Sequence, residues 1–388
     1  MDKINLNGLW EIRGGKYSTT GEIPGSVYSS LLSNGLMEDP FYRDNEIKAL
    51  EIMDNDFTFT KKFEYNGEFK KAVLVCEGID TVCDLYINGK KIANVDNMHR
   101  TYRFDVTDYL VAGANEIKAF FPCLDKIIKE LDKDMNLPRC VQPLKGYMHV
   151  RKAHCMFGWD WGPRLPDAGI WRDIYIMRED EPVIEDVRIL QNHGNGIVLL
   201  NVNVSTNLKC DIEIEITSPS GEILKAENGK EVKIENPELW WPNGYGKQNL
   251  YKIEVRAIKD GKTTDKKEKK VGLRTLTLNR EKDQWGESFC HEINGIKIFA
   301  MGADYIPEDN ILSRINKERT RVLLEDCIKS NFNAIRVWGG GYYPDDFFFE
   351  LCDELGLIIF FDCMFACAGY PFGDKFTENV KGEIIDNF

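Results

Sequence analysis

Apolar and polar residues alternate along much of the first 275 positions, which is the pattern of strands with one buried face. In residues 1–178, short runs at 71–76 and 83–87 are apolar or alternating, and the pair Asn88-Gly89 follows the second run. An Asn-Gly pair after a strand favours a two-residue hairpin. Short strands at this spacing predict a β-sandwich of the jelly-roll kind over residues 1–178.

Residues 179–275 show a cleaner alternation. The runs at 198–204, 212–216 and 250–255 alternate or are apolar, and turn residues separate them. The length fits an immunoglobulin-like β-sandwich of about 100 residues. The lysine-rich segment 262–270 is expected to be a solvated edge strand, because charge discourages pairing between edges.

From residue 276 the pattern changes to strands that alternate with helices. We expect a strand at 296–302, a helix at 316–329 with Asn316 as N-cap, and a second strand at 334–338. Two or more β/α steps in succession are typical of a parallel sheet covered by helices.

The next helix has recognisable ends. Pro344 is expected to open it, Asp345 and Asp346 to occupy its first turn, and Gly356 to end it. Residues 357–361 form a continuous apolar run, which predicts a parallel strand buried on both faces.

Three β/α steps favour a doubly wound sheet or a (β/α)8 barrel. A barrel needs eight strands and about 250 residues, whereas residues 276–388 supply three strands. The chain is therefore expected to start a barrel without closing it, and to end in the first part of a third helix.

Residues 157–163 read Phe-Gly-Trp-Asp-Trp-Gly-Pro, which places Trp159 and Trp161 on either side of Asp160. Flat indole faces suit the C–H side of a pyranose ring, and a carboxylate accepts hydrogen bonds from its hydroxyls. A turn whose tryptophans fill a core gives the same sequence. Both interpretations are open on these residues alone.

The second and third parallel strands end in polar or aromatic residues. Because side chains alternate along a strand, Arg336 and Trp338 are expected to face the barrel interior, and Asp362 to end the third strand. Substrates bind at this rim in barrel enzymes. The alternatives are a buried ion pair for Arg336, packing for Trp338 and helix capping for Asp362.

Composition excludes several classes of partner. The net charge of −13 argues against nucleic acid and anionic membranes, and no segment is apolar and long enough to span a bilayer. The first residues lack the apolar segment of a signal peptide, and the 11 cysteines are odd in number and scattered, so we expect a cytoplasmic protein with free thiols. Cys363 and Cys367 alone are a weak metal signature, and no metal site is predicted.

Four segments together resemble glycoside hydrolase family 2, and within it the β-mannosidase branch. They are residues 151–163 with 169–172, 238–246, 336–341 and 361–368. Members that act on β-galactosides or β-glucuronides resemble one another in an Arg-Thr-Ser-His-Tyr-Pro-like segment, whereas residues 336–344 contain no histidine. Exo-β-glucosaminidases remain a neighbouring possibility. Phe57-Thr58-Phe59 departs from the Trp-x-Tyr-like pair expected there and keeps aromatic packing.

The resemblance implies a multidomain fold: a jelly-roll sugar-binding-like sandwich (1–178), an immunoglobulin-like sandwich (179–275) and part of a TIM barrel (276–388). It also implies a retaining mechanism without a cofactor, in which two glutamates about 5–5.5 Å apart act as acid/base and nucleophile. The family carries them on the fourth and seventh barrel strands. No catalytic residue is therefore assigned in this chain, which we expect to be inactive alone. Solvated or capping roles are expected for the remaining candidates, Glu308, Glu350, Glu354, Glu378 and Glu383.

The resemblance also assigns substrate contacts. Asp160 is expected to accept hydrogen bonds from the hydroxyls of a β-mannoside or manno-oligosaccharide, with Trp159 or Trp161 as a wall. Trp338, Asp362 and Arg336 are expected to line the site from the barrel side. The alternatives are a non-catalytic carbohydrate-binding or structural module, and an exo-β-glucosaminidase. The break inside a β/α unit favours a portion of a longer enzyme, and the sequence does not indicate an oligomeric state.

Overall fold

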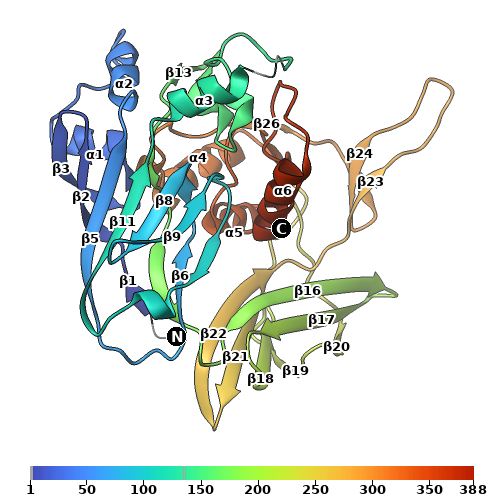
Figure 1. Ribbon diagram of the computed structural model, residues 1–388. Helices are drawn as coiled ribbons and strands as arrows, with labels where there is room; N and C mark the ends of the chain where they lie inside the picture. The colour runs from blue at the N-terminus through green and yellow to red at the C-terminus, as the bar shows by residue number, and fades with distance from the viewer. Residues whose placement is uncertain (1–2, 134, 136) are drawn as a thin grey trace.

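The computed structural model describes residues 3–133, 135 and 137–388, and we name its three regions by residues 1–178, 179–275 and 276–388. The amino-terminal region (1–178) consists of two main antiparallel sheets that face each other (Figure 1). Its four-stranded sheet has the order β1 (Lys3–Asn5), β15 (Ile174–Arg178), β6 (Ala72–Cys76) and β10 (Tyr102–Asp105). Its six-stranded sheet has the order β3 (Tyr17–Ile23), β2 (Gly8–Gly14), β5 (Phe57–Tyr65), β11 (Gly113–Phe121), β8 (Cys83–Ile87) and β9 (Lys90–Val95).

Alternation positions the core of this region. Phe57 and Phe59 on β5 point inward and are almost fully buried, while Thr58 between them is partly exposed. The predicted hairpin is confirmed: Asn88 and Gly89 join β8 to β9 with φ values of 50° and 76°, as a type I′ turn requires.

Short elements cover one end of the region. They are helices α1 (Val27–Ser33), α2 (Glu46–Met53) and α3 (Leu124–Asp132), the small sheet β4 (Gly25–Ser26), β14 (Gly169–Ile170) and β7 (Ile79–Asp80), and the hairpin β12 (Phe157–Trp159) and β13 (Gly162–Arg164).

The middle region (179–275) is a second pair of antiparallel sheets, as the sequence predicts. One has the order β16 (Ile184–Gly194), β17 (Ile197–Thr206) and β20 (Glu231–Glu235). The other has the order β19 (Ile223–Ala226), β18 (Asp211–Thr217), β21 (Tyr251–Lys259) and β22 (Lys262–Val271). The lysine-rich strand β22 lies at the edge of its sheet with most side chains exposed, as predicted.

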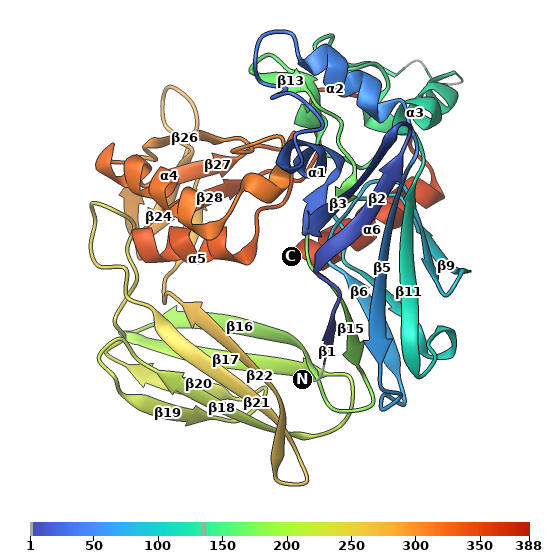
Figure 2. The ribbon, with the colours of Figure 1, turned by 90° about the vertical axis from the view of Figure 1, so that its left-hand side faces the viewer.

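The carboxyl-terminal region (276–388) begins with the antiparallel strands β23 (Leu276–Asn279), β24 (Cys290–Ile293) and β25 (Ile296–Ile298). The parallel strands β26 (Gly302–Tyr305), β27 (Ala334–Val337) and β28 (Ile358–Phe361) follow. Helices α4 (Lys317–Lys329) and α5 (Asp346–Leu355) lie side by side along this parallel sheet (Figure 2), and α6 (Asp374–Asn387) lies against the amino-terminal region.

The structure confirms some boundaries of this region and corrects others. Asn316 caps α4 by accepting a hydrogen bond from the backbone N–H of Arg319 at 3.0 Å, and Gly356 ends α5 in the left-handed conformation. The strand predicted at 296–302 was wrong: β25 turns back on β24, and the first parallel strand starts only at Gly302. A Cβ at Gly302 would lie 1.8 Å from the carbonyl oxygen of Ala334, so this close strand pairing requires glycine.

Two further predictions were wrong. Helix α5 begins at Asp346, after Pro344 and the N-cap position Asp345. Strand β28 is not buried on both faces, because Phe360 is 45% exposed. In the described part of the chain, α4 and α5 cover the face that carries Ile335 and Val337, which pack against Leu324, Phe348 and Leu351. Among the residues that the structure describes, no helix is both long and apolar enough to cross a membrane.

Candidate functional site

Three indoles from two regions meet at one point. Trp159 ends β12, Trp161 lies in the two-residue turn that leads to β13, and Trp338 follows β27. The ring of Trp338 lies 4.9 Å from that of Trp159 and 5.6 Å from that of Trp161, with interplanar angles of 68° and 73°. Both contacts are edge-to-face, a favourable geometry for aromatic pairs. The hairpin of the amino-terminal region therefore rests on the end of a parallel strand.

Glycines permit this approach. Gly158 has a φ of +97°, and a Cβ there would lie 2.4 Å from Cγ of Arg164 across the hairpin. A Cβ at Gly340 would lie 2.0 Å from the ring of Trp338. The indole of Trp338 can fold back over its own loop only because residue 340 has no side chain.

The far strand of the hairpin is held in place by an ion pair. Glu46 at the start of α2 accepts hydrogen bonds from the backbone N–H of Arg164 at 3.0 Å and from its Nε at 3.1 Å. Partial burial would raise the pKa of Glu46, but the hydrogen bonds and charge of Arg164 outweigh burial and lower it. Asn310 also donates to the carbonyl oxygen of Pro163 at 3.1 Å. The hairpin is thus positioned by groups on both sides.

Asp160 lies at the tip of the hairpin. Its side chain is exposed, and it makes no hydrogen bond or ion pair with any residue described between Lys3 and Phe388. Trp161 beside it is 39% exposed, whereas Trp159 is half-buried and also packs edge-to-face against Tyr147. The free carboxylate and the more accessible indole of Trp161 are therefore available to a ligand together.

An arginine joins two carboxylates next to the loop that starts with Trp338. Arg336 on β27 binds Asp362 through Nη2 at 2.6 Å and Nε at 3.2 Å, and binds Asp304 on β26 through Nη1 at 3.2 Å. The side chain of Arg336 is 41% exposed, so its ion pair is not the buried one that the sequence left open. Asp362 does not cap a helix but accepts the backbone N–H of Gly339 at 3.2 Å.

Asp304 was missed from the sequence. It pairs in register with Arg336, which in turn pairs with Phe360, so the three side chains share one sheet face. The predicted strand boundary at 302 placed Asp304 in a loop, although its position at the carboxyl end of a parallel strand was the available signal.

Two of the five candidate glutamates lie in unexpected environments. The side chain of Glu308 is only 3% exposed, and its Oε1 accepts hydrogen bonds from Tyr305 at 2.8 Å and Thr320 at 2.6 Å. Glu383 is completely buried. The solvated or capping role predicted for both was wrong, because tertiary partners enclose them. Glu350 and Glu378 are exposed as predicted, and Glu354 forms half-exposed ion pairs with Lys270 and Arg321.

Comparisons with known proteins agree with this architecture. Residues 10–172 match the model of the glycosyl hydrolase 2 galactose-binding domain-like family, and residues 183–274 match that of glycosyl hydrolases family 2.

Relatives match over nearly the whole chain. It is 35% identical to a β-mannosidase of Capra hircus, over 98% of this chain and 47% of that protein. It is 33% identical to β-mannosidase B of Aspergillus terreus, over 94% of this chain and 45% of that protein. The chain thus spans about half the length of these curated relatives.

Solved structures show the same similarity. A β-D-mannosidase from Dictyoglomus thermophilum superposes with a TM-score of 0.92 at 35% identity, over 100% of this chain and 50% of that one. An exo-chitosanase from Amycolatopsis orientalis shares the fold, with a TM-score of 0.75 at 19% identity, over 100% of this chain and 47% of that one. With both family models, the relatives and the fold in agreement, the chain belongs to glycoside hydrolase family 2.

Proposed function

We propose that the protein encoded by the whole reading frame is a retaining β-mannosidase that releases terminal β-linked mannose from non-reducing ends. The observation that carries this proposal is the contact of Trp159 and Trp161 with Trp338 beside the unpaired carboxylate of Asp160. An aromatic wall next to a free acceptor is suited to the two kinds of surface on a pyranose.

The same proposal covers the domains. Residues 1–178 form a jelly-roll sugar-binding-like domain, residues 179–275 an immunoglobulin-like domain, and residues 276–388 the first three β/α units of a TIM barrel. The parallel register of β26, β27 and β28 supports the barrel, as does the length of the relatives. Asp362, Arg336 and Asp304 then lie at the rim where barrel enzymes bind substrate.

Each side chain has a separate task in the proposed site. Asp160 accepts hydrogen bonds from sugar hydroxyls, and the exposed indole of Trp161 packs against the C–H face of the ring. A carboxylate offers about four acceptor positions. Asp362 uses three of them on Arg336 and Gly339, which leaves one for a hydroxyl. Arg336 orients both rim carboxylates through its hydrogen bonds to them.

The two catalytic carboxylates are expected on strands that follow β28. A retaining glycosidase needs them about 5–5.5 Å apart across the anomeric carbon. Glu308 and Glu383 are occupied by buried hydrogen bonds, so neither is free to serve. The chain therefore contributes substrate contacts, the chemistry needs no cofactor, and we expect residues 1–388 alone to leave an aryl β-mannoside intact.

A panel of aryl glycosides tests the proposal. The protein expressed from the whole reading frame should hydrolyse aryl β-D-mannoside with a higher kcat/KM than aryl β-D-glucosaminide, and should release β-mannose first. Preference for the glucosaminide would favour the exo-β-glucosaminidase alternative. If the folded, full-length protein hydrolysed no glycoside of the panel, only the alternative of a non-catalytic module would remain.

A further inference from the structure

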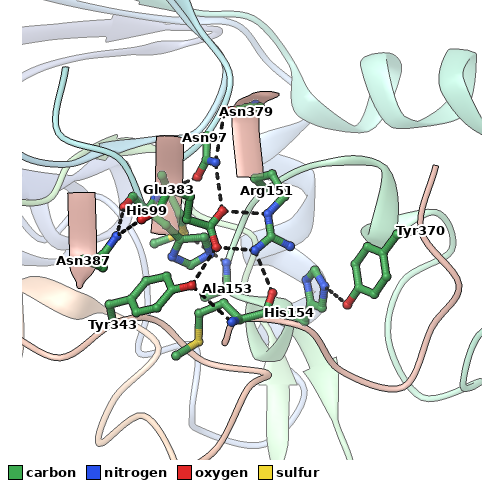
Figure 3. Close-up of polar contacts among 12 residues, drawn as sticks. Asn97, His99, Arg151, Ala153, His154, Tyr343, Tyr370, Asn379, Glu383 and Asn387 are labelled. Atoms are coloured by element: carbon green, nitrogen blue, oxygen red, sulfur yellow. Dashed lines mark hydrogen bonds and ion pairs between the residues drawn. The ribbon is translucent and has the colours of Figure 1, made fainter. Parts of the chain in front are cut away.

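A buried polar cluster joins α6 to the amino-terminal region and is centred on Glu383 (Figure 3). The carboxylate accepts four hydrogen bonds: from Nε and Nη2 of Arg151 at 2.9 and 2.6 Å, from Asn97 at 2.9 Å and from Tyr343 at 2.9 Å. Glu383, Arg151 and Asn97 are almost completely buried. The cluster thus connects segments more than 200 residues apart, since Arg151 and Glu383 are separated by 232 positions.

The cluster also touches both loops that carry the candidate site. Arg151 donates through Nη2 to the carbonyl oxygen of Met364 at 2.8 Å, two residues after Asp362. Its guanidinium lies 4.4 Å from the ring centre of Phe365. Tyr343, which donates to Glu383, belongs to the loop that starts with Trp338. Arg151 and Glu383 therefore hold both rim loops.

A short segment links the cluster to the hairpin. Arg151 lies six residues before Phe157, where β12 begins. Between them, the backbone N–H of Cys155 donates to the carbonyl oxygen of Gly340 at 2.9 Å, in the loop of Trp338. The carbonyl oxygen of Arg151 accepts the backbone N–H of Met98 at 3.0 Å. With both ends of this segment bonded, a displacement of Arg151 should move the hairpin relative to Trp338.

The charges of the pair suit a positioning role better than a stabilising one. Burying both ions has a large desolvation cost, and a buried pair is often no more stable than apolar residues of the same volume. The bidentate arrangement does fix distance and orientation. Burial would raise the pKa of Glu383, but the charge that His99 carries at very low pH, the charge and hydrogen bonds of Arg151 and the hydrogen bond of Asn97 outweigh burial and lower the pKa to about 2. His99 beside the cluster has its pKa lowered to about 3 by burial, so at neutral pH it is uncharged.

We propose that Arg151 and Glu383 are positioning residues that hold the Trp159–Asp160–Trp161 hairpin on the loops of Trp338 and Asp362. Their importance for substrate binding rests on the proposed function. Their control of hairpin geometry does not, and it can be measured without any sugar.

Circular dichroism of the indoles measures this geometry. Indole rings whose centres lie 4.9 and 5.6 Å apart couple electronically, so the three rings should give an exciton-coupled pair of bands, the paired indole signal. Trp338→Phe should abolish this signal in the folded chain. The isosteric change Glu383→Gln removes the charge without removing volume. We expect this variant to keep its far-ultraviolet spectrum and to lose the paired indole signal.

A matched control lies on the same helix. Asp386 on α6 also bonds the amino-terminal region, through Nε of Arg100 at 3.1 Å, but near the surface. Asp386→Asn should leave the indole signal intact. Retention of the full signal in Glu383→Gln would overturn the proposal.

A second variant tests the proposal if Glu383→Gln does not fold. The double change Arg151→Met with Glu383→Leu replaces the ion pair by apolar side chains, which buried sites commonly tolerate. We expect it to fold without the paired indole signal. A folded double variant with the wild-type signal would overturn the proposal, as would loss of folding in both variants, because the pair would then support the fold as a whole. Inactivity of the full-length protein on mannosides would refute the proposed function and leave this result unaffected.

Discussion

Removing the indole of Trp338 should loosen the hairpin that rests on it. In Trp338→Ala the hairpin loses both edge-to-face contacts, to Trp159 and to Trp161. Each such pair contributes about 0.5–1.5 kcal/mol beyond the area it buries, so local opening should become easier by about 1–3 kcal/mol. For amides that exchange by local opening, this corresponds to exchange about 5- to 150-fold faster.

Hydrogen exchange followed by mass spectrometry measures this change on the peptide that contains β12 and β13. Trp285→Ala is the matched control, because Trp285 is 85% exposed, and this variant should leave hairpin exchange unchanged. Peptides from the middle region provide an internal reference, because the ring contacts and apolar packing described for Trp338 lie in the other two regions. Wild-type exchange rates in the hairpin of Trp338→Ala would refute the contact between the two regions on which the candidate site depends.

Three further outcomes are expected. Glu383→Ala should lower the free energy of unfolding by about 3–5 kcal/mol, because it leaves Arg151 buried and unpaired, whereas Asp386→Ala should cost about 0–1 kcal/mol; urea unfolding compares them. Burial raises the pKa of Asp167 to about 7. Its contribution to the free energy of unfolding is therefore greatest below pH 4, and should fall by up to about 4 kcal/mol as the pH rises to 8. Asp167→Asn should remove this slope in urea midpoints measured across that range. Gly340→Ala should displace Trp338 and shift tryptophan emission to longer wavelength, since its Cβ would collide with the indole.

Local patterns predicted much of the fold because they are governed by nearby residues. Alternation, the Asn88-Gly89 turn and the capping residue Asn316 each act within a few positions, and the structure contains the elements they predict. Strand boundaries were less predictable. The run from Ile296 to Gly302 is apolar apart from Lys297, but a turn at Asn294 and Gly295 pairs residues 296–298 with β24, and the parallel strand β26 begins only at Gly302.

The candidate site was predictable in its residue types and not in its contacts. Because side chains alternate along a strand, the sequence placed Arg336 on the face of β27 opposite Ile335, as the structure shows. The burial of Glu383 could not be predicted locally, because no other residue of α6 is buried and its partner Arg151 is 232 residues away. A charged residue on a helix is ordinarily solvated, and only tertiary structure supplies the exception.

The kcat/KM of the full-length protein on aryl β-D-mannoside, measured for Asp160→Asn, tests the account most directly. Asp260→Asn is the control, because Asp260 is likewise an exposed aspartate at the tip of a hairpin, between β21 and β22. Losing charged hydrogen bonds worth about 1.5–3 kcal/mol should lower kcat/KM about 10- to 150-fold in Asp160→Asn. The control should match the wild type. An unchanged kcat/KM in Asp160→Asn would contradict the claim that this hairpin forms part of the substrate site.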